Sequence, residues 1–205
     1  AQRLQDIGSS ILRAARDELY LGMRFLDVAL SSFIYQMDGS VSPFGTDGAV
    51  MYFHPAQLGG LYKENRILVN RGYLHMVFHC IFRHFGKPGI EKRLWNLSCD
   101  IAVEHMIDGI YHRSVRYSRS LLRRETYRLL EKEKKTLNAE RIYKILKEEF
   151  LKEKELAQLE KEFYVDDHKY WANQQPDRNP NPLMSKKWED ISDGIETDLG
   201  TFSRE

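Results

Sequence analysis

The sequence predicts an α+β fold that is mostly helical and carries a small β-sheet. Apolar residues recur at helical spacing along most of the 205 residues. The clearest strand is residues 49–54, Ala-Val-Met-Tyr-Phe-His, which follows a turn-rich segment and ends at Pro55. Two helices, expected at residues 66–85 and 92–110, leave little polar surface, so both should be buried beside this sheet.

The remaining elements follow from the same patterns. The first 33 residues form a long helix or a helix pair, with a break expected near Gly22. The helix at 66–85 should stop at Gly86, Pro88 and Gly89. Further along we expect charged helices outside the core at 139–150 and 152–163, a loop or linker at 173–182 and a last helix at 186–199. Residues 1–172 should therefore be one domain, and residues 173–205 a linker and helix leading toward a further domain.

Composition disfavours several classes of protein. Thirty-one basic and thirty acidic residues give a formal net charge of +1, which predicts neither nucleic acid nor a membrane as a partner. Cys80 and Cys99 lie in apolar helical segments and not in a C-x-x-C pair, so a disulfide scaffold and a thiolate metal site are both disfavoured. Without a signal peptide or a bilayer-spanning apolar run, we expect a soluble cytoplasmic protein. The arginine-rich segment 113–128 could bind phosphate, but a solvated face is the more usual outcome.

His75 and His79 are the strongest functional signal in the chain. Two histidines four residues apart on a helix project from one face, where both imidazoles can reach one divalent ion. In the metalloprotease motif H-E-x-x-H the glutamate is the general base, but here Met76 takes that place and its thioether cannot accept a proton. The sequence thus predicts metal binding but little or no general peptidase activity, which Met76→Glu should create or raise.

Asp100, Glu104 and Asp108 lie on one stripe of the next helix, flanked by apolar residues. An ionised carboxylate buried without a partner costs several kcal/mol, so this stripe should meet a metal, a cation or hydrogen-bond donors. We expect Asp100 to be the third metal ligand. Glu104 is expected as an alternative ligand, as a residue that orients an imidazole, or as the base that replaces the missing glutamate. The alternative is that Asp100 and Glu104 only accept hydrogen bonds from the two histidines or an arginine.

Two further histidines are weaker candidates, as alternative ligands or as residues that orient the ligands. On a continuous helix His84 lies about 140° from His79, so it should point away from the pair and interact with the helix dipole when protonated. His168 follows Asp166 and Asp167. These three residues have ligand chemistry, but the pattern favours a surface Asx turn or a helix cap.

In these residues the chain resembles a bacterial family described as putative metallopeptidase domains, which commonly precede a von Willebrand factor A-like domain. The likeness runs from about Leu12 to Trp171, and its most specific part is Trp-Asn-x-x-x-Asp at residues 95–100. Members of the family generally have H-E-x-x-H, so Met76 is the departure that matters.

The resemblance implies a zincin-like fold in which His75, His79 and Asp100 hold zinc. It also implies a partner ATPase of the MoxR type and a von Willebrand factor A-like domain. Two functions then compete. The first is a zinc-binding metallopeptidase-like domain, a hydrolase of peptides or proteins whose activity is impaired or lost because the general-base glutamate is absent. The alternative is a catalytically inactive zincin that serves as a binding or scaffolding module for the partner ATPase.

Overall fold

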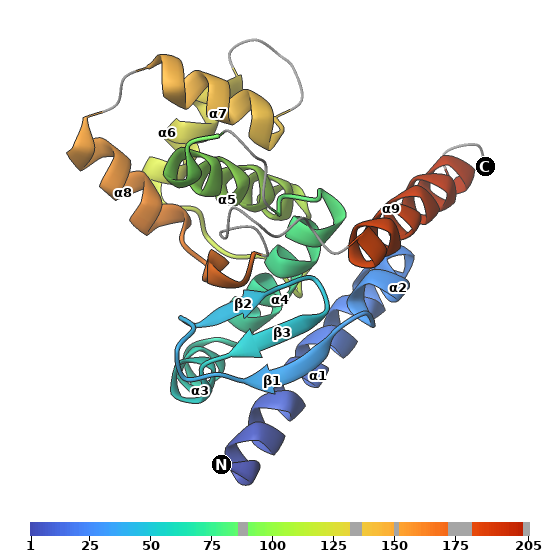
Figure 1. The fold of residues 1–205 in the computed structure, drawn as a ribbon. Helices are drawn as coiled ribbons and strands as arrows, with labels where there is room; N and C mark the ends of the chain where they lie inside the picture. The colour runs from blue at the N-terminus through green and yellow to red at the C-terminus, as the bar shows by residue number, and fades with distance from the viewer. Residues whose placement is uncertain (86–89, 132–136, 150–151, 172–181, 203–205) are drawn as a thin grey trace.

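The computed structural model describes residues 1–85, 90–131, 137–149, 152–171 and 182–202. In these residues one three-stranded sheet is accompanied by helices over the rest of the chain (Figure 1), which confirms the predicted mostly helical α+β fold. Within the same residues, no helix combines the length and the apolar character needed to cross a bilayer.

The N-terminal segment is a helix that breaks where the sequence predicted. Helix α1 (Gln2–Gly22) is followed by the short helices η1 (Arg24–Leu26) and α2 (Asp27–Leu30). A Cβ atom on Gly22 would lie 2.3 Å from the ring of His112. The absence of a side chain at Gly22 therefore leaves room for the His112 ring against the end of α1.

The sheet has the strand order β1-β3-β2. The predicted strand is confirmed as the central strand β3 (Val50–Phe53), with β1 (Ile34–Met37) parallel to it and β2 (Phe44–Thr46) antiparallel. The two edge strands were not predicted, because β1 has four residues and β2 only three, within a segment rich in turn residues. The Gln5 amide of α1 hydrogen-bonds the exposed edge of β1, donating to Tyr35 O at 2.9 Å and accepting from Met37 N at 2.6 Å, which fixes the helix to the sheet.

Three helices follow the sheet: α3 (Pro55–Glu64), which was not predicted, α4 (Arg66–Ile81) and α5 (Lys92–Gly109). Helix α4 is buried from Val69 to Ile81, as expected for a central helix. It ends four residues before the predicted end at residue 85. Phe82 closes the helix and Arg83 adopts a left-handed backbone with φ of 54°, which turns the chain before the expected stop at residues 86–89, outside the described residues.

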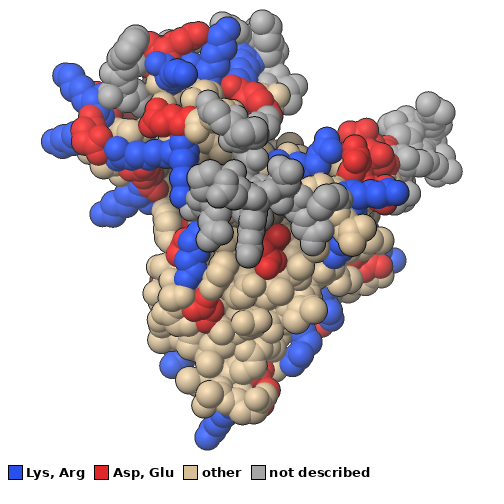
Figure 2. Space-filling view, viewed as in Figure 1, with Lys and Arg blue, Asp and Glu red and all other residues tan. Residues whose placement is uncertain are grey.

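The second half of the chain packs around α5. Helices α6 (Leu121–Leu130), α7 (Ala139–Glu148) and α8 (Glu153–Phe163) form one group with it (Figure 1). The charged helices predicted at 139–150 and 152–163 are thus confirmed within two residues, whereas α6 was not predicted. Their expected place outside the core was wrong, because each helix also carries apolar residues that are buried in a second core. Lysine, arginine, aspartate and glutamate side chains crowd over this group in Figure 2, while the face that covers the sheet has few of them.

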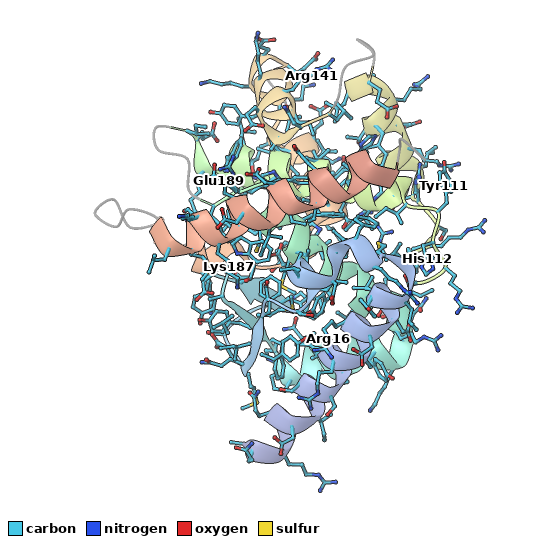
Figure 3. All side chains as sticks on the ribbon, turned by 90° about the vertical axis from the view of Figure 1, so that its right-hand side faces the viewer. Arg16, Tyr111, His112, Arg141, Lys187 and Glu189 are labelled. Atoms are coloured by element: carbon cyan, nitrogen blue, oxygen red, sulfur yellow. The ribbon has the colours of Figure 1, made fainter. Side chains whose placement is uncertain are left out.

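The last helix, α9 (Pro182–Phe202), returns to the first half of the molecule and crosses it in the view of Figure 3. Trp188 is 2% exposed and donates to Gly48 O at 2.9 Å. Lys187 donates to Ser32 O at 3.0 Å, and Glu189 lies 3.3 Å from Arg83. The predicted loop at 173–182 lies almost wholly outside the described residues, and the predicted domain boundary at residue 172 stays a prediction.

Two apolar cores result from this arrangement. The first contains buried residues of α1, the sheet, α3, α4 and α9, and the second contains those of α5 to α8 together with Trp171. Cys80 lies in the first and Cys99 in the second, both as buried free thiols. Helices α4 and α5, which carry the predicted site residues, lie where the two cores meet.

Candidate metal centre

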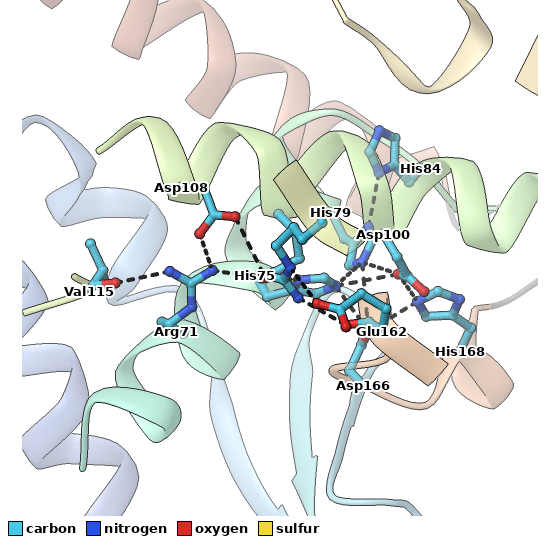
Figure 4. A network of polar contacts seen from close by, with 12 residues as sticks. Arg71, His75, His79, His84, Asp100, Asp108, Val115, Glu162, Asp166 and His168 are labelled. Atoms are coloured by element: carbon cyan, nitrogen blue, oxygen red, sulfur yellow. Dashed lines mark hydrogen bonds and ion pairs between the residues drawn. The ribbon is translucent and has the colours of Figure 1, made fainter. Parts of the chain in front are cut away.

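Five buried side chains from three parts of the chain converge between α4 and α5. His75 and His79 come from α4, Asp100 comes from α5, and Asp166 and His168 come from the segment after α8 (Figure 4). One ligand atom from each residue lies within 4.8 Å of the other four. The structure therefore brings together the three predicted ligands and places two further candidate donors, Asp166 and His168, beside them.

The distances within the cluster fit a single metal ion. His75 Nε2 lies 2.8 Å from His79 Nε2 and 3.4 Å from Asp100 Oδ1. His168 Nε2 lies 3.1 Å from Asp100 Oδ1 and 3.0 Å from Asp166 Oδ1. A divalent ion bound about 2.1 Å from each donor holds neighbouring donors roughly 3.0–3.4 Å apart. The donor set would need little rearrangement to coordinate such an ion.

The second carboxylate oxygen of Asp166 gives an independent sign that the cluster accepts a cation. Asp166 Oδ2 is buried and has no hydrogen-bond partner among the described residues. A buried acceptor left unpaired is costly, and a native structure usually has a reason for it. A metal bound by Asp166 would supply the missing partner.

The histidine ring nitrogens outside the cluster are held by neighbouring side chains. His75 Nδ1 lies 2.8 Å from Glu104 Oε1, so this nitrogen donates and leaves Nε2 directed at the cluster. His79 Nδ1 lies 2.9 Å from His84 Nδ1. Such contacts fix the orientation and tautomer of a metal-binding imidazole and are typical of metal sites.

The segment that carries Asp166 and His168 is fixed against the sheet and the second core. Asp167 N donates to Phe44 O of β2 at 2.8 Å, and the Asp167 carboxylate accepts from Lys169 N at 3.0 Å to cap the short helix η3 (His168–Tyr170). Trp171 stacks on the His168 ring with 3.7 Å between centroids. The predicted cap is confirmed for Asp167. The prediction of a surface turn was wrong for Asp166 and His168, which are 1% and 8% exposed.

A network of arginines satisfies the carboxylates of α5 that lie outside the cluster. Glu104 Oε2 accepts from Arg71 at 2.7 Å and from Arg123 at 2.6 Å, and Asp108 accepts from Arg71 at 2.8 Å and from Tyr127 at 2.9 Å. The expectation that the acidic stripe meets cations and donors is confirmed. Arg123 is only 13% exposed in its side chain, so the prediction of a solvated arginine face was wrong for this residue.

The geometry favours Glu104 as the residue that orients His75. Its carboxylate lies on the Nδ1 side of the His75 ring and is not a member of the five-residue cluster. Burial alone would raise the pKa of Glu104, but the hydrogen bond from His75 and the charges of Arg71 and Arg123 hold it well below the usual range. A carboxylate held so strongly in its ionised form is a weak proton acceptor, which argues against Glu104 as the general base.

His84 contacts His79 on the Nδ1 side of its ring, although the sequence predicted that His84 would point away from the histidine pair. The prediction assumed a continuous helix, but α4 ends at Ile81 and the turn at Arg83 brings the His84 ring back to His79. Burial, followed by the charge of His79, lowers the pKa of His84 well below its usual value. The lowered pKa disfavours the protonated ring on which the predicted interaction with the helix dipole depends, and that interaction stays a prediction.

Without a metal the cluster is a network of histidinium and carboxylate groups. Burial lowers the pKa of His168, but Asp100 and Asp166 raise it more, to about 10. The pKa of His75 is likewise raised, because hydrogen bonds to Asp100, Asp166 and Glu104 outweigh the effect of burial. Burial raises the pKa of Asp100 and Asp166, and His168 with the other two histidines lowers both below the usual range.

The cluster opens to a pocket of about 350 Å³. Three of the five donors line it, namely Asp100, Asp166 and His168, together with the first turns of α5 at Arg93 and Asn96. A volume of this size is at the lower end of ligand pockets. A small ligand or part of a larger one could therefore reach the cluster.

Met76 does not line this pocket. It is fully buried among the apolar residues of the first core, and the expectation that a glutamate here would raise activity stays a prediction. We expect Met76→Glu to lower the free energy of unfolding by several kcal/mol, because an unpaired carboxylate is buried. The matched variant Met76→Leu should cost less than about 1.5 kcal/mol. Urea unfolding of both variants measures the difference, and a Met76→Glu chain as stable as the parent would show that position 76 faces a cation.

The two cores with a buried cluster of three histidines and two aspartates between them define a domain able to hold a metal ion. Comparison with known protein families is consistent with a metal-binding domain. The family described as putative metallopeptidase domain matches residues 9–199, and the chain belongs to this family. No curated protein and no solved structure gives a significant match.

Proposed function

We propose that this chain is a zinc-binding, metallopeptidase-like domain with little or no general peptidase activity. The observation that carries the proposal is the buried cluster of five donors at the end of a pocket. Imidazole and carboxylate donors suit zinc, although other divalent ions share this preference. Bound zinc would supply Lewis-acid polarisation of a carbonyl oxygen that enters the pocket.

In this proposal each residue of the site has a separate role, either as a metal ligand or as a residue that orients a ligand. His75, His79, Asp100, Asp166 and His168 would bind the metal, Glu104 would orient His75, and His84 would orient His79. General-base catalysis typically contributes 10²–10⁴-fold to such reactions. Neither Met76 nor the arginine-bound Glu104 can provide it, which is why we propose low peptidase activity.

The second candidate is a catalytically inactive zincin that serves as a binding or scaffolding module. Five protein donors are more than the three of a typical catalytic zinc site, and structural sites are those in which the protein fills all positions. In this alternative the exposed charged helices α6 to α8 would contact a partner (Figure 2). We propose an ATPase of the MoxR type and a von Willebrand factor A-like domain as such partners.

Elemental analysis after dialysis, combined with a cleavage assay, tests these proposals. We expect about one zinc per chain, because the cluster offers ligands from both motif helices and from the Asp166–His168 segment. The zinc-loaded chain should cleave an unstructured protein substrate slowly at most, and a chelator should abolish whatever cleavage is seen. The scaffold alternative predicts no cleavage at all. Rapid, chelator-sensitive proteolysis would overturn the proposal of low activity. A chain without metal whose stability does not respond to added zinc would overturn both candidates.

A further inference from the structure

A second hollow, of about 630 Å³, lies on the segment that joins α5 to α6. This segment begins near Tyr111 and His112, which Figure 3 labels. Five residues line the hollow, namely Arg116, Tyr117, Ser118, Arg119 and Arg124. Three are arginines, two carry hydroxyl groups and none is acidic. The lining shares no residue with the metal cluster.

Two of the three arginines in this hollow lack an ion pair with a described carboxylate, as other exposed arginines of the chain also do. Arg71, Arg93 and Arg123 each form ion pairs with carboxylates. In contrast, Arg116 and Arg124 are exposed and form no ion pair with any described residue. Cations that share a hollow without a counter-charge repel one another. A bound anion would offset this repulsion.

The third arginine is already positioned. Arg119 donates to the backbone oxygen of Asp108, and its Nε lies 3.8 Å from the Asp108 carboxylate. Helix α6 begins at Leu121, directly beyond the segment, and its N-cap Ser120 already donates to Glu162 at 2.7 Å, so the end of this helix adds little to the hollow. The hollow thus has one fixed cation and two exposed ones beside hydroxyl donors.

We propose that this hollow binds a phosphoryl group carried by a larger ligand. Guanidinium groups bind two oxygens of a tetrahedral oxyanion at once, and the hydroxyl groups of Tyr117 and Ser118 can donate to the others. Stacking of nucleic-acid bases requires several aromatic side chains, and only Tyr117 lines the hollow. The volume greatly exceeds that of a free phosphate ion, which leaves room for the molecule that carries it.

Titration with inorganic phosphate and with a short phosphoserine peptide, followed by the side-chain NMR signals of arginine, tests the proposal. Both probes should shift the signals of Arg116 and Arg124, in zinc-loaded and in chelator-treated chains alike, and the peptide should bind more tightly than phosphate. Arg116→Ala/Arg124→Ala should weaken binding at least about tenfold. The matched variant Arg113→Ala/Arg128→Ala removes the same charge outside the hollow and should change binding less than about twofold.

Three outcomes would overturn the proposal. The first is the absence of saturable binding. The second is an equal effect of the two double variants, which would mean a response to net charge alone. The third is tighter binding of an unphosphorylated acidic peptide of the same length than of the phosphoserine peptide, which would assign the hollow to carboxylate side chains of a protein partner.

Discussion

Replacing both His75 and His79 by alanine is expected to abolish metal binding by the chain. The double variant removes the two imidazoles that lie 2.8 Å apart and leaves two aspartates with His168. A set of one imidazole and two carboxylates on different segments binds a divalent ion far more weakly. Elemental analysis after dialysis and calorimetric titration with zinc measure the loss, and circular dichroism confirms that the variant is folded.

The matched control is His54→Ala/His105→Ala, which removes two imidazoles that lie outside the cluster. This control should still bind about one zinc per chain. Equal zinc contents of the two double variants would contradict the assignment of the cluster as the metal site.

The effect of a single substitution on zinc affinity should depend on whether the residue belongs to the cluster or contacts it from outside. Asp100→Asn should weaken zinc binding more than Glu104→Gln, because Asp100 lies in the cluster and Glu104 acts through His75. His84→Ala should weaken binding by about 10–100-fold, which is the usual effect of losing a residue that orients a ligand. The reverse order of Asp100→Asn and Glu104→Gln would exchange the roles of the two carboxylates.

The metal-free and zinc-loaded forms are expected to respond to pH in opposite directions. In the metal-free form the pKa of His168 is raised to about 10, above the ordinary histidine value of about 6.5. The stability that this group contributes is therefore fully present below about pH 6.5 and is lost as the pH rises toward 10. His75, whose pKa is raised in the same direction, adds to this loss.

Zinc binding reverses the dependence because zinc requires neutral imidazoles. For each proton that zinc displaces, the affinity of the chain for zinc rises up to about tenfold per pH unit. The rise ends at the pH at which the histidines of the metal-free chain are already neutral. Thermal unfolding at pH 6, 7.5 and 9, with chelator and with zinc, measures both trends. The stabilisation by zinc should grow with pH. A chelator-treated chain that becomes more stable between pH 6 and 9 would contradict the buried histidinium network.

The parts of the site that could be predicted are those on regular helices. His75, His79 and Asp100 obey the helical period, so their direction followed from their spacing. Asp166 and His168 lie on an irregular segment far along the chain, where no period indicates which way a side chain points. Their burial depends on contacts with β2 and Trp171 that only the folded chain provides.

The errors in the fold have similar physical causes. The end of α4 depends on a left-handed backbone at Arg83, a residue type that carries no signal for it. Strand β2 has three residues and exists because it pairs with β3, so its own sequence contains too little pattern. In contrast, β3 and α5 are long or apolar enough to be recognised from local sequence, and both were predicted nearly to their ends.

The origin of the five donors in three distant stretches of chain has a kinetic consequence. His75 and His168 are separated by roughly ninety residues, and closing a loop of that length is entropically costly and slow before other contacts exist. The two cores must therefore form and dock before the cluster is complete. If the cluster binds a metal as proposed, uptake should consequently be a late event in folding, and its rate would report on the docking of the two halves rather than on the formation of either one.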